Sequence, residues 1–181
     1  MQYYNEININ NIKIEPLTKQ NDYLVEGFSC GEIDFDKFIY YDALGNECKI
    51  YLILYKNIML GFFGITATGI ITNKMENDNI KEIYNEPAIE INYFATDEKY
   101  HGMYIDEQHS EQETLSDIIF IKVLSFIAEI QNIIGFKYII LYSVKPAVNF
   151  YKKHNFEEFN KYMVRNVKQY INDCIPLFIR I

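Results

Sequence analysis

The sequence predicts a mixed α/β fold in one domain over residues 1–181, with six to seven strands in one sheet and about four helices. The first observation is an apolar strand at 88–96, followed by a glycine-bearing turn and a long apolar helix. The second is a pair of strand-like runs, 49–55 and 59–68, around Lys56-Asn57, which is typical of a hairpin. The third is the length, because 181 residues can form a full core without a metal or a disulfide.

The N-terminal part of the chain is expected to hold one short strand and one helix. Ile12 to Ile14 alternates with polar neighbours, as in a half-buried strand, and Pro16 ends it. Apolar residues between 33 and 44 recur at spacings of three and four, which indicates one buried helical face. Gly45-Asn46 is expected to stop that helix. The polar and acidic stretch 75–86 is expected to be a surface excursion between two strands.

The C-terminal part is expected to alternate between helices and strands. The helix from Leu115 to Ile130 is apolar on nearly all sides, which indicates a central, buried position. Thr114 and Asp117 stand at its start with the spacing of a capping box. The remaining expected elements are a buried strand at 137–143, a short helix that begins at Pro146, and closing strands at 156–159 and 175–181.

Composition limits the classes of function. The net charge is −8 and the chain has only two arginines, so a nucleic acid is not the favoured partner, and a cationic amine suits the acidic surplus better. No apolar run reaches the roughly 18 residues that a membrane helix needs, and no signal peptide is visible. Three cysteines without CxxC spacing are typical of a reducing compartment, so we expect a cytoplasmic protein. The histidines share no ligand-like spacing, so we expect no metal site.

Three separated stretches share a pattern with known proteins. They are Phe28, Cys30, Gly31, Phe35, Asp36, Phe38, Ile39 and Ala43, then Pro87 to Asp97, then Ala147, Phe150, Tyr151, Asn155 and Phe156. The patterns are F-x-C-G-x-x-x-L-D-x-F-L-x-x-x-A, P-A-x-x-L-G-R-L-A-V-D and A-x-x-F-Y-x-x-x-G-F. In this order they resemble the GCN5-related N-acetyltransferase (GNAT) superfamily, and most closely its toxin-type branch. Asn92 and Tyr93 replace the Gly and Arg of the second pattern, and Asn155 replaces the Gly of the third.

The resemblance implies an acetyl-CoA-dependent N-acetyltransferase with a GNAT-like sheet. Acetyl-CoA would be the cosubstrate, and an amine would attack its thioester directly. By this resemblance, the backbone of Phe94, Ala95 and Thr96 would hydrogen-bond the pantetheine arm and the thioester oxygen, as an oxyanion hole does. His101 and Gly102 would belong to the turn that approaches the pyrophosphate. An ordinary central strand remains the alternative for 94–96.

Two residues are the catalytic candidates. Tyr151 stands at the position of the family's general acid and would also contact the cofactor. A phenol with a pKa near 10 could protonate a departing thiolate with a pKa of about 8 to 9. Glu90 could act as a base through a water, although a glutamate on a strand more often faces solvent, and a substrate amine would need little help. We expect Cys30 to be a packing residue and not a nucleophile.

The phosphate-binding turn departs from the family pattern. An acidic insertion from Tyr104 to Glu113, which includes Asp106, Glu107 and Glu111, stands where the family starts its helix at once. These charges would repel a pyrophosphate, so a non-catalytic GNAT-fold binding or regulatory module is the alternative function. For partners, the resemblance implies an antitoxin protein and charged transfer RNA as acceptor, but the net charge of −8 disfavours a nucleic acid, so a small-molecule or protein amine is at least as suitable an acceptor. The acyl chain and the oligomeric state, with a homodimer among the options, are left open.

Overall fold

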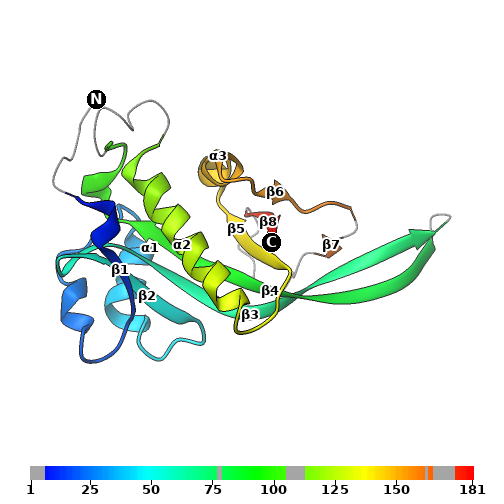
Figure 1. The fold of residues 1–181 in the computed structure, drawn as a ribbon, viewed down its shortest axis with the longest axis horizontal. Coiled ribbons are helices and arrows are strands. Elements are labelled where there is room, and N and C mark those ends of the chain that lie inside the picture. Colours follow the sequence, from blue (N-terminus) through cyan, green and yellow to red (C-terminus); the bar gives the residue numbers. More distant parts are fainter. Residues whose placement is uncertain (1–6, 77–78, 105–112, 162, 165–173) are drawn as a thin grey trace. The chain divides into compact units, whose positions relative to one another are not determined.

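The computed structural model describes residues 7–76, 79–104, 113–161, 163–164 and 174–181 (Figure 1). These residues form two compact units: Met1–Ile65 with Tyr93–Ile127, and Thr66–Asn92 with Ala128–Ile181. The described strands follow the order β1-β2-β3-β4-β5-β8-β6, and β7 pairs with β3. Parallel and antiparallel pairs both occur, which confirms the predicted mixed α/β class. The predicted single domain stays a prediction.

The first unit contains the predicted hairpin. Strand β1 (Ile12–Pro16) pairs antiparallel with β2 (Lys49–Tyr55), which pairs antiparallel with β3 (Ile58–Glu76). Lys56 and Asn57 join β2 to β3, and both have positive φ angles, 48° and 64°. Two successive positive φ values match the right-handed twist of the paired strands, so the turn confirms the hairpin that the sequence predicts.

Helices α1 (Ile33–Lys37) and α2 (Leu115–Gln131) also belong largely to this unit. A single π-helical turn, Phe38–Asp42, continues α1, and Gly45 follows it with a φ of 91°, as expected after a helix. The side chains of α2 that face the core are fully buried (Leu115, Ile119, Phe120, Val123 and Ile127). Helix α2 is therefore the central, buried helix that its apolar pattern predicts.

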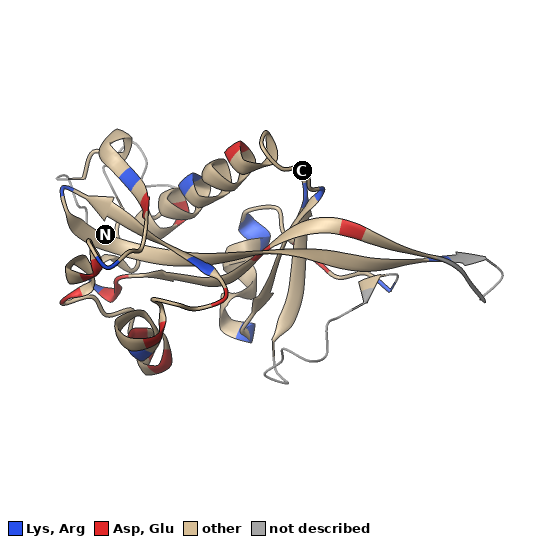
Figure 2. Cartoon of the chain, turned by 90° about the horizontal axis from the view of Figure 1, so that it is seen from below, with Lys and Arg blue, Asp and Glu red and all other residues tan. Residues whose placement is uncertain are grey.

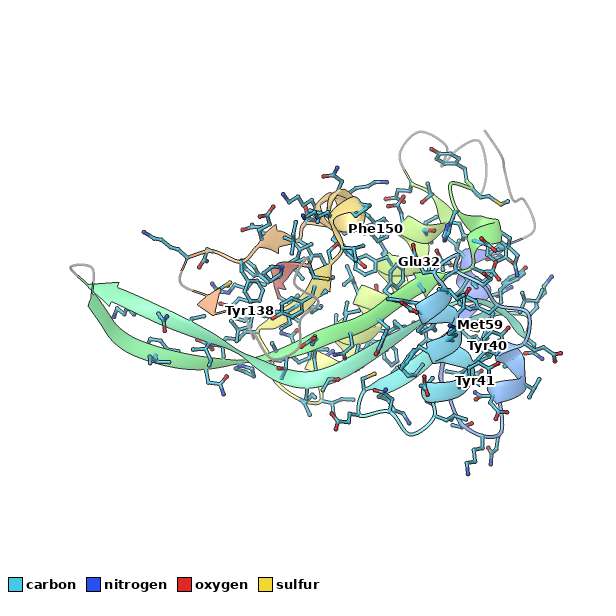
Figure 3. All side chains as sticks on the ribbon, turned by 180° about the vertical axis from the view of Figure 1, so that it is seen from behind. Glu32, Tyr40, Tyr41, Met59, Tyr138 and Phe150 are labelled. Atoms are coloured by element: carbon cyan, nitrogen blue, oxygen red, sulfur yellow. The ribbon has the colours of Figure 1, made fainter. Side chains whose placement is uncertain are left out.

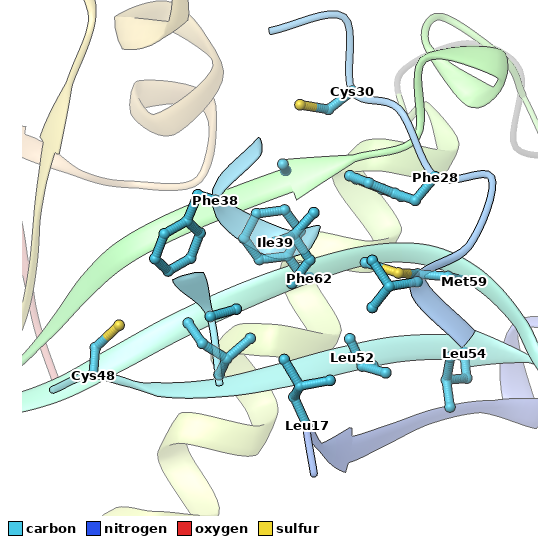
Figure 4. Close-up of a cluster of buried hydrophobic side chains, with 14 residues drawn as sticks. Leu17, Phe28, Cys30, Phe38, Ile39, Cys48, Leu52, Leu54, Met59 and Phe62 are labelled. Atoms are coloured by element: carbon cyan, nitrogen blue, oxygen red, sulfur yellow. The ribbon is translucent and has the colours of Figure 1, made fainter. Parts of the chain in front are cut away.

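The first motif of the sequence lies in the core of this unit. Figure 4 shows Phe28, Cys30, Phe38 and Ile39 within one cluster of buried apolar side chains. The ring of Phe38 stacks on Tyr93 of β4 (Asn79–Thr96) with 4.0 Å between centroids. Burial raises the pKa of the Cys30 thiol to about 12, so this sulfur is a poor nucleophile, in agreement with the predicted packing role.

The second unit is built on a parallel pair of strands. Ala88–Ile91 of β4 lies opposite 138–141 of β5 (Tyr138–Ser143), and β5 pairs antiparallel with β8 (Ile175–Arg180). The short strand β6 (Glu157–Glu158) pairs with β8, and β7 (Met163–Val164) pairs with β3. Helix α3 (Val148–Lys153) follows a 3-10 turn at Lys145–Ala147 that contains Pro146.

One expectation about this unit is wrong. The stretch 75–86 is not an excursion between strands, because β3 continues to Glu76 and β4 begins at Asn79. The two strands form a long hairpin that extends beyond β5 and β8 (Figures 1 and 2). Ile83 and Tyr84 are exposed there, so this part needs no buried face and depends on backbone pairing. A polar composition therefore did not prevent strand formation.

Candidate active site

The end of β4 lies very close to β3. A Cβ atom added to Gly61 of β3 would overlap the carbonyl oxygen of Ala95, so only glycine allows the two backbones to approach this closely. Ala95 and Thr96 are buried, and the ring of Phe94 packs 4.9 Å from the ring of Phe120 on α2. The side chains of Ala95 and Thr96 are thus enclosed, whereas Phe94 is partly buried, and the predicted cofactor-binding role of 94–96 rests on their backbone.

A short turn follows β4 and carries the next two predicted residues. The Nε2 atom of His101 lies 3.0 Å from the carbonyl oxygen of Thr96, and the Thr96 hydroxyl lies 3.1 Å from that of Ser116 on α2. Gly102 has a φ of 68°, a conformation that glycine adopts without strain, and no atom lies within 4 Å of a Cβ built there. The structure therefore brings Thr96, His101, Gly102 and the start of α2 together.

Asp97 supports this turn from inside. Its carboxylate accepts the backbone N–H of Lys99 at 3.1 Å and pairs with the Lys99 Nζ at 2.7 Å. The Asp97 N–H donates to the carbonyl of Leu60, and the Glu98 N–H donates to that of Ser29. The turn is thus tied to β3 and to the segment that carries the first motif, all within the first unit.

The N-terminus of α2 is satisfied by the protein's own acceptors. The backbone N–H and the hydroxyl of Thr114 both donate to Oδ2 of Asp117, at 2.7 and 2.8 Å, and the Asp117 N–H lies 3.3 Å from the Thr114 hydroxyl oxygen. The Leu115 N–H donates to the carbonyl of Met103 at 2.8 Å. This reciprocal arrangement confirms the predicted capping box. Asp117 is 2% exposed, so a buried carboxylate lies in the first turn of α2.

The acidic insertion is only partly described. Glu113 precedes the capping box, whereas Asp106, Glu107 and Glu111 lie outside the described residues. The predicted repulsion of a pyrophosphate by these three side chains therefore stays a prediction. The structure does describe one acidic side chain at this helix start, that of Asp117, which the sequence predicted only as a capping residue.

Glu90 is more enclosed than the sequence suggested. Its side chain is 9% exposed, and burial raises the pKa of its carboxyl group. The Asn92 Nδ2 donates to Glu90 Oε1 at 3.2 Å, and the Thr66 hydroxyl donates to Asn92 Oδ1 at 2.7 Å. The expectation that a strand glutamate faces solvent is wrong here. Asn92 and Thr66 were missed, although residues two apart on a strand share a face, and this spacing could have revealed Asn92.

Tyr151 lies on α3 within an aromatic group. Its ring is 5.3 Å from that of Phe150 and 6.1 Å from that of Phe156, measured between centroids. Burial raises the pKa of the Tyr151 phenol above its ordinary value, so the phenol stays protonated at neutral pH. The predicted proton transfer to a thiolate needs this protonated form, but the raised pKa makes the transfer less favourable than for an exposed phenol.

The candidate residues divide between the two units. Phe94, Ala95, Thr96, His101 and Gly102 belong to the first unit, and Glu90 and Tyr151 belong to the second.

Among the residues that the structure describes, no group of His, Cys, Asp and Glu side chains could hold a metal ion. None of the described helices is long and apolar enough to cross a membrane.

Comparison with known proteins gives structural relatives only. No family model matches the sequence, and no curated protein matches it. A solved structure of a tyrosine-to-phenylalanine mutant of the toxin AtaT matches with a TM-score of 0.71 at 16% identity, over 98% of this chain and 93% of that chain. A mutant of KacT with the same kind of substitution matches with 0.67 at 15% identity, over 94% and 95%.

Further matches concern complexes of AtaT. The structure of AtaTR bound with acetyl-CoA has a TM-score of 0.66 at 15% identity and covers 94% of each chain. Other matches are AtaT with the C-terminus of the antitoxin AtaR and AtaT with acetyl-methionyl-tRNAfMet. This chain therefore shares its fold with the toxin AtaT and with KacT, in agreement with the fold that the three sequence motifs predict.

Proposed function

We propose that this protein is an acetyl-CoA-dependent N-acetyltransferase. The observation that supports it most is a fold shared with AtaT over nearly the whole chain, because AtaTR has been solved with acetyl-CoA bound. In the proposed reaction the amine nitrogen attacks the thioester carbonyl carbon, a C–N bond forms and the C–S bond breaks. The amine loses a proton and the departing thiolate gains one.

Each proposed role has a structural counterpart. The backbone of 94–96 would hold the thioester, and the close approach at Gly61 supports a rigid strand end there. Tyr151 would protonate the thiolate from its neutral form. Glu90 would take the proton from the amine, and its buried carboxyl, whose pKa is raised, suits a base that works near neutral pH.

A second function is favoured by one observation. The N–H of Thr114 donates to Asp117, and the N–H groups of Leu115 and Asp117 donate to Met103 and Thr114, so protein acceptors already bind these amides at the helix start. A non-catalytic binding or regulatory module needs no phosphate site and would retain the same fold. The two functions differ in whether acetyl-CoA binds at all.

For the acceptor we propose a small-molecule or protein amine. AtaT has been solved with a charged tRNA, so tRNA is the competing acceptor. Binding to a polyanion needs several cations, whereas this chain carries a net charge of −8. Three lysines lie on and beside α3 (Lys145, Lys152 and Lys153), but Lys152 pairs with Glu158 at 2.6 Å. A cationic amine is therefore the better match in charge.

The other partners are proposed on the same grounds. AtaT has been solved with the C-terminus of its antitoxin, so we propose an antitoxin-like protein as a partner of this chain. Location in the cytoplasm, where acetyl-CoA and aminoacyl-tRNA are made, also belongs to this proposal. The oligomeric state, with a homodimer among the options, stays open.

Thermal unfolding with added ligand tests the proposal. With 1 mM acetyl-CoA and a dissociation constant of about 10 µM, the native state gains about 2.7 kcal/mol, which raises Tm by several degrees. A turnover assay with a panel of small amines, peptides and charged tRNA then identifies the acceptor class. No Tm shift up to 1 mM and no turnover with any acceptor would favour the non-catalytic module.

A further inference from the structure

Glu90 belongs to a chain of three polar side chains in the second unit. The Thr66 hydroxyl donates to the Asn92 carbonyl oxygen at 2.7 Å, and the Asn92 amide nitrogen donates to the Glu90 carboxylate at 3.2 Å. Thr66 stands on β3, and the other two residues stand on β4. Because the hydroxyl proton is directed to the carbonyl oxygen of Asn92, the amide is oriented with its NH₂ group toward Glu90.

The surroundings of this chain of hydrogen bonds are aromatic and apolar. Glu90 is in register with Ile140 of β5, and alternation along the strand places Ala88, Glu90 and Asn92 on one face. Ala88 and Ile140 pack on that face with Ile70 and with partly buried Tyr138, Tyr142, Phe159, Met163 and Phe178. Figure 3 shows Tyr138 among these side chains. An enclosed carboxyl on an apolar face needs a fixed donor to remain a usable base.

We propose that Asn92, oriented by Thr66, is a positioning residue that holds the Glu90 carboxylate for proton uptake from the acceptor amine. The inference rests on the proposed acetyltransferase function and adds two residues to its site. An N–H donated to a carboxylate stabilises the ionised form, whereas burial favours the neutral form. Asn92 therefore opposes part of the effect of burial and keeps Glu90 ionised at lower pH.

The other titratable or charged groups on this face also influence Glu90. By register and alternation they are Lys74 of β3, Tyr84 and Glu86 of β4, Tyr138 and Tyr142 of β5, Glu157 of β6 and Arg180 of β8. Glu86 pairs with Lys137 at 2.5 Å, so its charge is balanced locally. The substitutions described next leave all of these groups in place, so a change in the titration of Glu90 reports on Asn92 and Thr66.

The test compares pH profiles of kcat/KM for acetyl transfer in the full chain. Asn92→Leu keeps the side-chain volume and removes the donor, so the acid limb should move to higher pH by about one unit. Thr66→Val keeps the shape and removes the hydroxyl, so it should move the limb in the same direction by less. Thr66→Ser keeps the hydroxyl and should restore the wild-type profile. Thr68→Val, two residues further along β3, is the matched control and should leave the profile unchanged.

A ¹³C NMR titration of the Glu90 carboxyl in the free variants gives a readout without turnover and should move with the kinetic limb. If Asn92→Leu lowers kcat equally at every pH and leaves the Glu90 titration unmoved, Asn92 only packs and the inference fails. If Glu90→Gln retains wild-type turnover, the inference also fails while the proposed function stands. If the wild-type chain acetylates no acceptor at any pH, the proposed function fails as well, and that outcome is recognised before any variant is made.

Discussion

Two buried carboxylates of this chain have different surroundings. Asp117 accepts two hydrogen bonds from Thr114, three residues away, at the start of a 17-residue helix. Glu90 is held by Asn92, whose orientation depends on Thr66 on another strand, 26 residues away. Asp117 therefore completes a helix start, whereas Glu90 accepts a hydrogen bond from a residue that another strand orients. Both carboxylates are buried, so they differ in the source of their hydrogen bonds.

The two units also differ in what their described polar side chains do. The described polar contacts around Thr96, His101 and α2 in the first unit support the backbone. The second unit contains the two catalytic candidates, Glu90 and Tyr151, and burial raises the pKa of both. We therefore expect substitutions in the first unit to change stability and cofactor affinity, and substitutions of Glu90 and Tyr151 to change turnover.

The largest expected effect is on turnover. Tyr151→Phe removes only the proposed proton donor, so kcat should fall by about 10²-fold, or about 2.7 kcal/mol in activation free energy. Acetyl-CoA affinity and Tm should change little, because the ring and its aromatic contacts remain. Steady-state kinetics and calorimetry measure both quantities. Unchanged kcat would remove Tyr151 from the mechanism.

The next effect is on the stability of the first unit. Gly61→Ala places a methyl group against the carbonyl oxygen of Ala95, so the strands must separate and the free energy of unfolding should fall by about 2 kcal/mol. Gly135→Ala is the control, because nothing lies within 4 Å of its Cβ position and its φ is not positive. Denaturant unfolding compares them. Equal stability of the two variants would show that β3 and β4 can separate at this point without cost.

A smaller effect distinguishes the capping role of Asp117 from the effect of its negative charge on acetyl-CoA binding. Asp117→Ala removes the acceptor of the capping box and should lower the free energy of unfolding by about 1 kcal/mol. Asp117→Asn keeps an acceptor and removes the charge, so it should cost less and should increase acetyl-CoA affinity by a few-fold. Calorimetry with acetyl-CoA and with an acetyl-pantetheine lacking the pyrophosphate distinguishes a charge effect. An equal gain for both ligands would mean that the pyrophosphate does not approach Asp117.

The smallest effect is the pH dependence of stability. The folded-state pKa of Glu90 is raised above its unfolded value, so the folded state binds more protons as pH passes between the two values. Glu90 therefore contributes stability at pH below its unfolded pKa, and that contribution is lost as pH rises through the folded pKa. Glu90→Gln should be at least as stable as wild type at pH 7 and should show a flatter profile from pH 4.5 upward. A variant less stable than wild type at pH 7 would contradict a carboxylate that is costly to bury.

The features predicted correctly from the sequence have local causes. The hairpin turn at Lys56-Asn57 and the capping box of Thr114 and Asp117 each depend on residues within a few positions. The buried face of α2 follows from periodicity within one element. These predictions needed no knowledge of which strands are neighbours. The wrong prediction for 75–86 had the opposite cause, because pairing between β3 and β4 outweighed a composition that disfavours strands.

The sequence by itself determined the order of strands and helices, the motifs that identify the fold, and the caps and turns, since these depend on short-range sterics and hydrogen bonds. Only the tertiary structure decided that Glu90 is buried, that Asn92 and Thr66 hold it, and that Gly61 permits the approach of Ala95. The contacts of Thr66 with Asn92 and of Gly61 with Ala95 join residues 26 and 34 positions apart, so they depend on the register between β3 and β4. That register is set by packing over the whole length of both strands, which no local pattern of residues encodes.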